Sequence, residues 1–299
     1  MELRERALGP VTVLFGADGG KYPDGNSLFV RGAEESLIVD PALGLVARRG
    51  ALPRVDRVVN SHCHEDHVAG NHLFPDVPWH LHEDDVVGMR SLDDFMAIFG
   101  YEGSFGDVWR RAVVERFHYT PRPDAAPFRD GDVFDLGGGV RVHVLHTPGH
   151  TRGHCALLVE PEGILYLGDI ELSSFGPYYG DAWSDLEAFE RSLARVREID
   201  ARWYATFHHV GVLDGRAAFL ERFDRFAGKI ADREGRMLMY LAEPRTLDEI
   251  AAHRFVYRPG DDVPYAEPVE KRHMGQHLRR LVARGAVREV APGRYQAAA

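Results

Sequence analysis

The segment His-Cys-His-Glu-Asp-His at positions 62–67 decides how this chain is interpreted. It follows an apolar run that is typical of a strand and precedes a region of helical periodicity. On an extended backbone, side chains two residues apart point to the same side, so His62 and His64 can face one metal ion. Asp66 and His67 lie in the following turn, where they can face a neighbouring position. Such imidazole and carboxylate groups suit Zn²⁺, and the two directions indicate a second ion.

The composition around this segment is that of an ordinary globular protein. The chain has 299 residues, of which 44% are hydrophobic and 27% are charged, and it contains 16 histidines. At about 150 residues per domain, this length predicts two domains, or one large α/β domain with an appendage. No apolar run is long enough for a transmembrane helix, and the N-terminal residues show no secretory signal. We therefore expect a cytoplasmic protein without membrane association.

Further motifs lie downstream of the first one, and together they resemble the metallo-β-lactamase superfamily. The H-x-H-x-D-H pattern of that family is intact at 62–67. Thr-Pro-Gly-His-Thr at 147–151 resembles the segment that provides the third histidine of the first metal, here His150. A Gly-Asp pair ending at Asp169 resembles the motif whose aspartate bridges both ions. These motifs occur in the order that is typical of the family.

The resemblance implies one more histidine ligand, for which the sequence offers two candidates. His208 and His209 follow a predicted strand, where the family often has Gly-His-Gly. The apolar pair at 212–213 favours His209, with His208 then packed or supporting the ligands from behind. Asp40, at the end of an earlier strand, matches a position that often supports the site in the same way. The resemblance covers roughly residues 10–227.

The implied site holds two zinc ions, with iron or manganese as alternatives. Its expected ligands are His62, His64 and His150 on the first ion, Asp66, His67 and His209 on the second, and Asp169 as the bridge. Two adjacent metal ions lower the pKa of a shared water, polarise a substrate carbonyl and stabilise the leaving group. We therefore expect a metal-bridging hydroxide as the nucleophile. Asp66 is the expected catalytic residue, because it can orient this hydroxide and pass its proton to the leaving group.

The predicted elements favour a mixed α/β fold. Strands are expected at several places before residue 60 and between 132 and 167, and an amphipathic helix at 185–199. For residues 1–227 the resemblance implies a four-layered αβ/βα sandwich, the metallo-β-lactamase fold. The aromatic segment 95–109 allows two interpretations, core packing between helices or the wall of a substrate pocket.

The chain changes character near residue 228. Residues 228–299 contain 13 Lys and Arg against 10 Asp and Glu, a net charge of +3, whereas the remainder has 23 against 36, a net charge of −13. Helices are expected at 229–241, 246–252 and 267–284, followed by a short hairpin around 292–293. Three helices and a hairpin are similar to a winged-helix domain, so we expect a second, winged-helix-like domain at 228–299.

These features favour a metal-dependent hydrolase of a small-molecule thioester, ester, lactone or amide. One alternative is a di-zinc nuclease that uses the basic third helix of the tail to bind nucleic acid. The net charge of −10 disfavours nucleic-acid binding without eliminating it. A second alternative, similar in fold, is a persulfide dioxygenase-like oxidoreductase with a single iron. A homodimer is left open as well.

Overall fold

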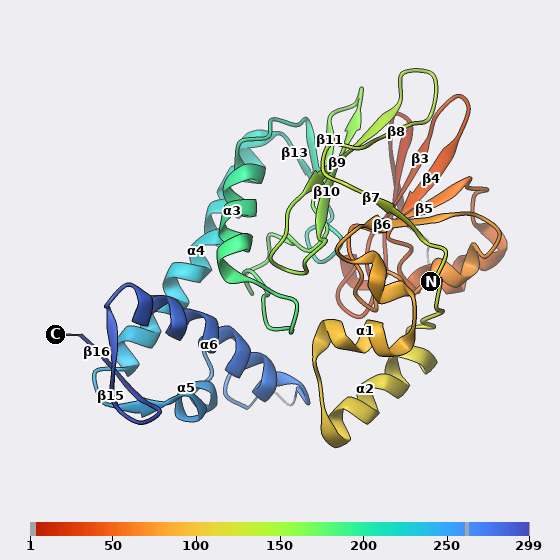
Figure 1. Ribbon diagram of the computed structural model, residues 1–299. Coiled ribbons are helices and arrows are strands. Elements are labelled where there is room, and N and C mark those ends of the chain that lie inside the picture. Colours follow the sequence, from red (N-terminus) through yellow and green to blue (C-terminus); the bar gives the residue numbers. More distant parts are fainter. Residues whose placement is uncertain (1–3, 261–262, 299) are drawn as a thin grey trace.

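Two β-sheets form the centre of the protein in this computed structural model, which describes residues 4–260 and 263–298 (Figure 1). The first sheet has 7 strands in the order β1-β2-β3-β4-β5-β6-β7. Its strands are β1 (Glu5–Leu8), β2 (Val11–Leu14), β3 (Ser27–Arg31), β4 (Ser36–Val39), β5 (Arg57–Val59), β6 (Trp79–His82) and β7 (Ala126–Phe128). Neighbours from β1 to β4 are antiparallel, and those from β4 to β7 are parallel.

The second sheet has 6 strands in the order β13-β12-β11-β10-β9-β8. Its strands are β8 (Val133–Asp135), β9 (Arg141–His146), β10 (Cys155–Glu160), β11 (Ile164–Tyr166), β12 (Trp203–Ala205) and β13 (Val212–Asp214). Only the pair β11 and β12 is parallel among these described neighbours. Short 3₁₀ segments lie in the loops, at η1 (Ala17–Gly19), η2 (Leu43–Ala51), η3 (Asn71–Leu73) and η4 (Val86–Met89).

The sheets pack face to face, and each is covered by helices on its outer side. Alternation along β3 shows why: Leu28 and Val30 enter the core between the sheets, whereas Phe29 enters the core on the opposite face. Helices α1 (Leu92–Phe99) and α2 (Gly103–Glu115) cover the first sheet. Helix α3 (Leu186–Arg197) and the first half of α4 (Arg216–Tyr240) cover the second. The four-layered αβ/βα sandwich expected from the resemblance is therefore confirmed.

Helix α4 runs across the expected domain boundary at 227/228 and begins earlier than the helix expected at 229–241. The helix has 25 residues and passes through that point without interruption. Its apolar stripe continues as well: Phe223 packs in the core of the second sheet, whereas Met237 belongs to a separate C-terminal core. One continuous helix therefore joins the sandwich to the C-terminal part.

The C-terminal part contains two further helices and a small sheet. Helices α5 (Leu247–His253) and α6 (Ala266–Ala283) pack with a 3-stranded sheet of order β14-β16-β15. Its strands are β14 (Arg245–Thr246), β15 (Val287–Ala291) and β16 (Arg294–Ala297). Thr246 starts α5 with a capping box, in which its side chain accepts from the Glu249 amide and Glu249 accepts in return.

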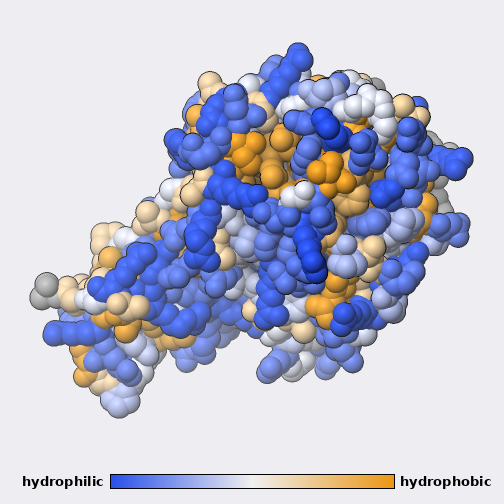
Figure 2. Space-filling model, turned by 45° about the horizontal axis from the view of Figure 1, so that its top comes forward, coloured by the Kyte–Doolittle hydropathy of each residue, from blue (hydrophilic) through white to orange (hydrophobic). Residues whose placement is uncertain are grey.

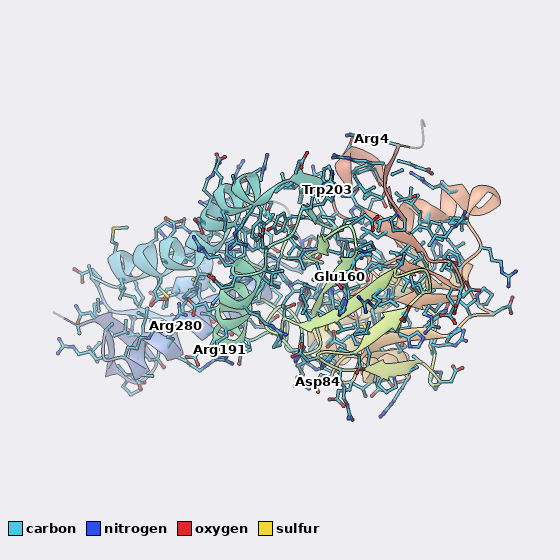
Figure 3. All side chains as sticks on the ribbon, turned by 90° about the horizontal axis from the view of Figure 1, so that it is seen from above. Arg4, Asp84, Glu160, Arg191, Trp203 and Arg280 are labelled. Atoms are coloured by element: carbon cyan, nitrogen blue, oxygen red, sulfur yellow. The ribbon has the colours of Figure 1, made fainter. Side chains whose placement is uncertain are left out.

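Three basic side chains of α6 make contacts within the protein. Arg272 Nη1 donates to the Phe99 carbonyl at the end of α1, over 2.6 Å. Lys271 pairs with Asp248 at 2.5 Å. Arg280 is buried and pairs with Glu190 of α3 and Glu234 of α4, and Figure 3 shows it near Arg191 where α6 meets α3. Arg272 and Arg280 thus attach α6 to the sandwich, whereas Lys271 remains half exposed.

The contact of Glu234 on α4 with His277 and Arg280 on α6 gives a testable pH dependence of the free energy of unfolding. Hydrogen bonds from His277 and Arg280, which outweigh the effect of burial, lower the pKa of Glu234 to about 2. A carboxyl whose folded pKa lies below its unfolded value stabilises the fold above the unfolded value, and this stabilisation is lost as the pH falls. We expect Glu234→Gln to lower the free energy of unfolding by about 2 kcal/mol at neutral pH. The difference from the wild type should shrink between pH 4.5 and pH 2.

Urea unfolding at several pH values measures this difference directly. A gap between the two proteins that stays constant from pH 6 to about pH 2 would contradict the assignment, because a constant gap means that the carboxyl has the same pKa in the folded and the unfolded protein.

The surface is mainly polar on the face shown in Figure 2, where apolar side chains gather in small patches. Large apolar side chains that remain exposed include Val108 and Val114 on α2 and Met239 at the end of α4. Over the described residues 4–260 and 263–298, no helix combines the length and apolarity that crossing a membrane requires.

Candidate metal centre

Loops that follow four strands of the two sheets bring the expected ligands together. The segment 62–67 follows β5, His150 follows β9, Asp169 follows β11 and His208 follows β12. Because these loops meet at one end of the sandwich, residues far apart in the chain become neighbours.

The first group consists of three histidines and one aspartate. His64 Nδ1 lies 3.1 Å from His62 Nε2 and 2.9 Å from His150 Nε2. Asp169 Oδ2 lies 3.1 Å from His150 Nε2. These four side chains are brought together as a set that can hold one metal ion.

The second group consists of Asp66, His67 and His208. His208 Nε2 lies 3.0 Å from Asp66 Oδ2, and His67 Nε2 lies 4.0 Å from Asp66 Oδ1. The other carboxylate oxygen of Asp169, Oδ1, is 2.9 Å from His67 Nε2. Asp169 thus presents one oxygen to each group, as a bridging ligand would.

His208 takes the place expected for His209. The side chain of His209 is 39% exposed, and its Nε2 is 3.7 Å from Glu171 outside both groups. His209 has a left-handed backbone with φ of 60°, and Gly211 follows with φ of 75°. This tight turn points the two adjacent imidazoles in different directions, and the structure brings His208, in place of the preferred His209, to Asp66 and His67.

Hydrogen bonds on the far side of the rings fix which nitrogen of each histidine faces the centre. Four of the rings have Nδ1 next to an oxygen that can accept its proton, which leaves Nε2 as a bare lone pair. The pairs are His62 with Ser61 Oγ (3.0 Å), His67 with Asp40 Oδ2 (2.8 Å), His150 with the Tyr178 carbonyl (2.9 Å) and His208 with the Gly20 carbonyl (2.8 Å). His64 is reversed: its Nε2 lies 3.3 Å from Asp181, and its Nδ1 faces the centre.

The donor set fits a metal cation. His67 Nε2 and Asp169 Oδ1 are buried and close together, yet neither has a hydrogen-bond partner among the described residues. Buried nitrogen and oxygen atoms without a hydrogen-bond partner cost free energy of folding. Here they lie together with the carboxylates of Asp66 and Asp169. A divalent cation satisfies all of them at once, and imidazole with carboxylate suits zinc or iron.

Electrostatics at the centre also favour positive charge. Burial alone would lower the pKa of His208, but the carboxylates of Asp169 and Asp66 raise it to about 9. Burial would raise the pKa of Asp169, but the imidazoles of His67, His208 and His150 hold it well below its ordinary value. The carboxylates therefore attract a positive charge, which a metal ion would supply.

Asp40, expected to support the site, holds His67 in place. Its Oδ2 accepts from His67 Nδ1, from Ser61 Oγ at 2.6 Å and from the Tyr166 hydroxyl at 2.8 Å. His154 Nε2 accepts from the Asp169 amide at 3.1 Å. Both residues orient a ligand from behind.

Two supporting carboxylates were missed by the sequence analysis. Asp85 is fully buried and accepts from the Cys63 amide, from Thr151 Oγ1 at 2.6 Å and from the Gly153 amide at 2.7 Å. Asp85 therefore connects the segment 62–67 to the segment 147–151. Asp181 contacts His64, as described above. Neither stands in a recognisable motif, so local sequence gave no signal for them.

A cavity of about 730 Å³ opens above the two groups. His64, Asp66, His150, Asp169 and His208 lie on its metal side. Its other walls are largely aromatic, from the α1–α2 region, the loop before α3 and the C-terminal part: Phe99, Tyr101, Trp109, Phe175, Tyr178, Tyr257 and Tyr265. The two interpretations of segment 95–109 both hold, because Phe95 is buried in the core while Phe99 lines the cavity.

Helix α6 supports the loop that forms one wall of this cavity. Gln276 Nε2 donates to the Tyr179 carbonyl at 2.8 Å, and His273 Nε2 accepts from the Tyr179 amide at 3.2 Å. The preceding residue, Tyr178, provides the carbonyl that orients His150. The C-terminal part thus helps to position a ligand of the first group.

Comparison with known proteins places this site in a family. Residues 22–226 match the family model of the Metallo-beta-lactamase superfamily. The chain is 28% identical over 173 residues to the acyl-coenzyme A thioesterase MBLAC2 of Homo sapiens, covering 50% of this chain and 60% of that protein. It is 28% identical over 205 residues to a hydroxyacylglutathione hydrolase of Methylococcus capsulatus, covering 64% and 66%. The chain thus spans about 60% of the length of the thioesterase relatives that it matches.

Two solved structures resemble nearly the whole chain. A metallo-beta-lactamase family protein from Thermus thermophilus has a TM-score of 0.71 and 25% identity, covering 97% of this chain and 99% of that one. A beta-lactamase domain protein from Burkholderia ambifaria has a TM-score of 0.67 and 20% identity, covering 98% and 93%. The likeness in fold therefore extends over the C-terminal part as well as the sandwich.

Proposed function

Because the chain belongs to the metallo-beta-lactamase superfamily, we propose that it is a metal-dependent hydrolase that cleaves a small acyl thioester. The observation that carries the proposal is the pair of ligand groups joined by Asp169 beside an aromatic cavity. Relatives named as an acyl-coenzyme A thioesterase and a hydroxyacylglutathione hydrolase support thioesters over the esters, lactones and amides that the sequence also allowed.

We assign the two metal positions to the two groups of side chains. His62, His64 and His150 would hold one ion, Asp66, His67 and His208 the other, and Asp169 would bridge them. Zinc is our first choice because all of the donors are imidazoles and carboxylates. Bound at these positions, the two ions supply an activated water and a Lewis acid for the substrate carbonyl.

The protein side chains would then handle the proton and the acyl group. The Asp66 carboxylate, 3.0 Å from His208, is placed to take the proton of the attacking water. As the C–S bond breaks, this proton passes to the leaving sulfur, so that an acid and a thiol are released. Phe99 and Trp109 provide apolar surface for the acyl chain and exclude water around it.

The alternatives have less support. The order α4, β14, α5, α6, β15, β16 is consistent with a winged-helix-like unit, which is how we interpret the C-terminal part. Yet its third helix, α6, uses Arg272 and Arg280 in contacts with the sandwich, which supports a packing role over nuclease activity. The complete second group of Asp66, His67 and His208 supports two ions over a single iron.

Thioester hydrolysis by the purified protein tests the proposal. Thiol release should follow from acyl thioesters, should stop after treatment with a chelator and should return when zinc, iron or manganese is added back. Hydrolysis that survives complete metal removal would contradict the proposed chemistry. Cleavage of RNA, but of no thioester, would favour the nuclease alternative.

A further inference from the structure

A second cavity of about 540 Å³ lies next to the first one. Ser174, Phe175 and Tyr257 line both cavities. The ring centroids of Phe175 and Tyr257 are 5.6 Å apart, so this aromatic pair marks the junction. A molecule that extends beyond the first cavity at this pair would meet the second one. We call the second cavity the basic groove.

The basic groove has a strong positive charge. Among the described residues that line it are four cations, Lys229, Arg233, Arg236 and Arg258, and one carboxylate, Asp232. Asp232 Oδ2 lies 3.9 Å from Lys229 Nζ and 3.7 Å from Arg236 Nε, beyond hydrogen-bond distance. Among the described residues, this one half-exposed carboxylate does not balance the charges of Lys229, Arg233 and Arg236 together.

Two of these arginines also make the groove rigid. Arg233 is buried and donates to the Pro177 carbonyl at 2.5 Å and to the Phe175 carbonyl at 2.7 Å. Arg236 donates to the Phe255 carbonyl on the opposite wall. Lys229 is partly exposed, and its first methylenes pack close to Gly176. The groove is therefore a preformed cationic site beside the catalytic cavity.

The two cavities differ sharply in character. The first has aromatic walls, and Arg222 is the only lysine or arginine among the described residues that line it. A ligand that fits both has an apolar acyl end and a strongly anionic end. Clusters of Lys and Arg are typical of phosphate-binding sites, because a phosphate can accept from several cations at once.

We propose that the basic groove binds the phosphate of a phosphopantetheine handle, so that the substrate is an acyl thioester of coenzyme A or of a phosphopantetheinylated carrier. This inference rests on the proposed thioesterase function. A nucleic acid is less compatible, because residues outside the C-terminal part have a net charge of −13, which repels a polyanion.

Three octanoyl thioesters test the proposal: those of coenzyme A, of 4′-phosphopantetheine and of N-acetylcysteamine. The third has no phosphate and reports thioesterase activity alone. We expect the wild-type KM to be about tenfold lower for the two phosphorylated substrates, because charge-assisted hydrogen bonds to phosphate strengthen binding. Similar KM values for the thioesters of coenzyme A and phosphopantetheine indicate that the protein recognises the phosphate that both share with carrier proteins. A lower KM for the coenzyme A thioester indicates that its nucleotide also contributes to binding.

The variant Lys229→Glu reverses one charge in the groove and keeps the methylenes that lie near Gly176. We expect it to raise the KM for octanoyl-coenzyme A about tenfold relative to the KM for the N-acetylcysteamine thioester, with kcat changed less than twofold. Arg225→Glu is the matched control, since it makes the same charge change one turn earlier on α4, outside the residues that line either cavity. Circular dichroism and thermal unfolding verify that both variants fold.

The outcomes separate the two proposals. Hydrolysis of all three thioesters with the same KM, or an equal effect of Lys229→Glu and Arg225→Glu, would overturn the inference and leave the thioesterase function standing. No hydrolysis of the N-acetylcysteamine or any other thioester would overturn the proposed function itself. Competition by an RNA oligonucleotide with a steep salt dependence, together with its cleavage, would assign the groove to nucleic acid instead.

Discussion

Replacing His208 by alanine is expected to leave about one metal ion per chain and to lower kcat at least a hundredfold. His208 Nε2 is 3.0 Å from Asp66 and belongs to a group with only two other members, Asp66 and His67. Losing one of so few protein ligands weakens the second metal position strongly, since even supporting residues change metal affinity roughly 10- to 100-fold. Elemental analysis and thioester kinetics on the same preparation measure both effects.

His209→Ala is the matched comparison, because it removes the adjacent imidazole. His209 lies outside both groups, with its side chain 39% exposed, so this variant should keep both ions and lose at most a few-fold in kcat. The reverse pattern, metal loss in His209→Ala and not in His208→Ala, would show that the loop places the other imidazole at the metal.

The second large effect is expected for Asp66→Ala. Asp66 combines two proposed roles, holding the second ion and transferring the proton, so its removal should lower kcat about a thousandfold or more. The buried carboxylate has no part in the core between the sheets, so the thermal unfolding of the variant should remain cooperative.

Asp84→Ala serves as the control for this variant. Asp84 is a half-exposed carboxylate outside the cavity and outside the two groups, and Figure 3 shows it away from Arg280 and the C-terminal part. It should retain nearly full activity. Turnover by Asp66→Ala within about tenfold of the wild type would remove Asp66 from its proposed catalytic role.

Most of the candidate ligands that the structure brings together stand in short motifs of the sequence. His62, His64, Asp66 and His67 lie within six residues, so their proximity follows from local geometry. The choice between His208 and His209 depends on a left-handed residue within a turn, which neighbouring residues did not specify. The supporting carboxylates of Asp85 and Asp181 act across the fold, which is why no local pattern revealed them.

The fold was predicted least well at the edges of the sheets and at the start of helix α4. Strand β1 contains charged residues and β7 contains a proline at the edge of the sheet, so neither has the apolar alternation that predicts a strand. A helix was expected to begin at residue 229, near the change of charge, but helix formation follows the apolar stripe. That stripe continues along α4 from Phe219 to Met237.

The role of the C-terminal part also depends on tertiary contacts. Its basic third helix was expected from composition, and nucleic acid was one interpretation of it. In the structure, Arg272 contacts the end of α1 and Gln276 supports the wall loop at Tyr179. Only the packing of α6 against the sandwich distinguishes a supporting helix from a binding helix.

The metal content of the purified wild-type protein tests the central claim most directly. Two groups of ligands joined by Asp169 predict about two ions per chain, as measured by elemental analysis after saturation with zinc and removal of loosely bound metal. A content that stays at one ion per chain, or near zero, under these conditions would contradict the two-metal centre from which the proposed hydrolysis follows.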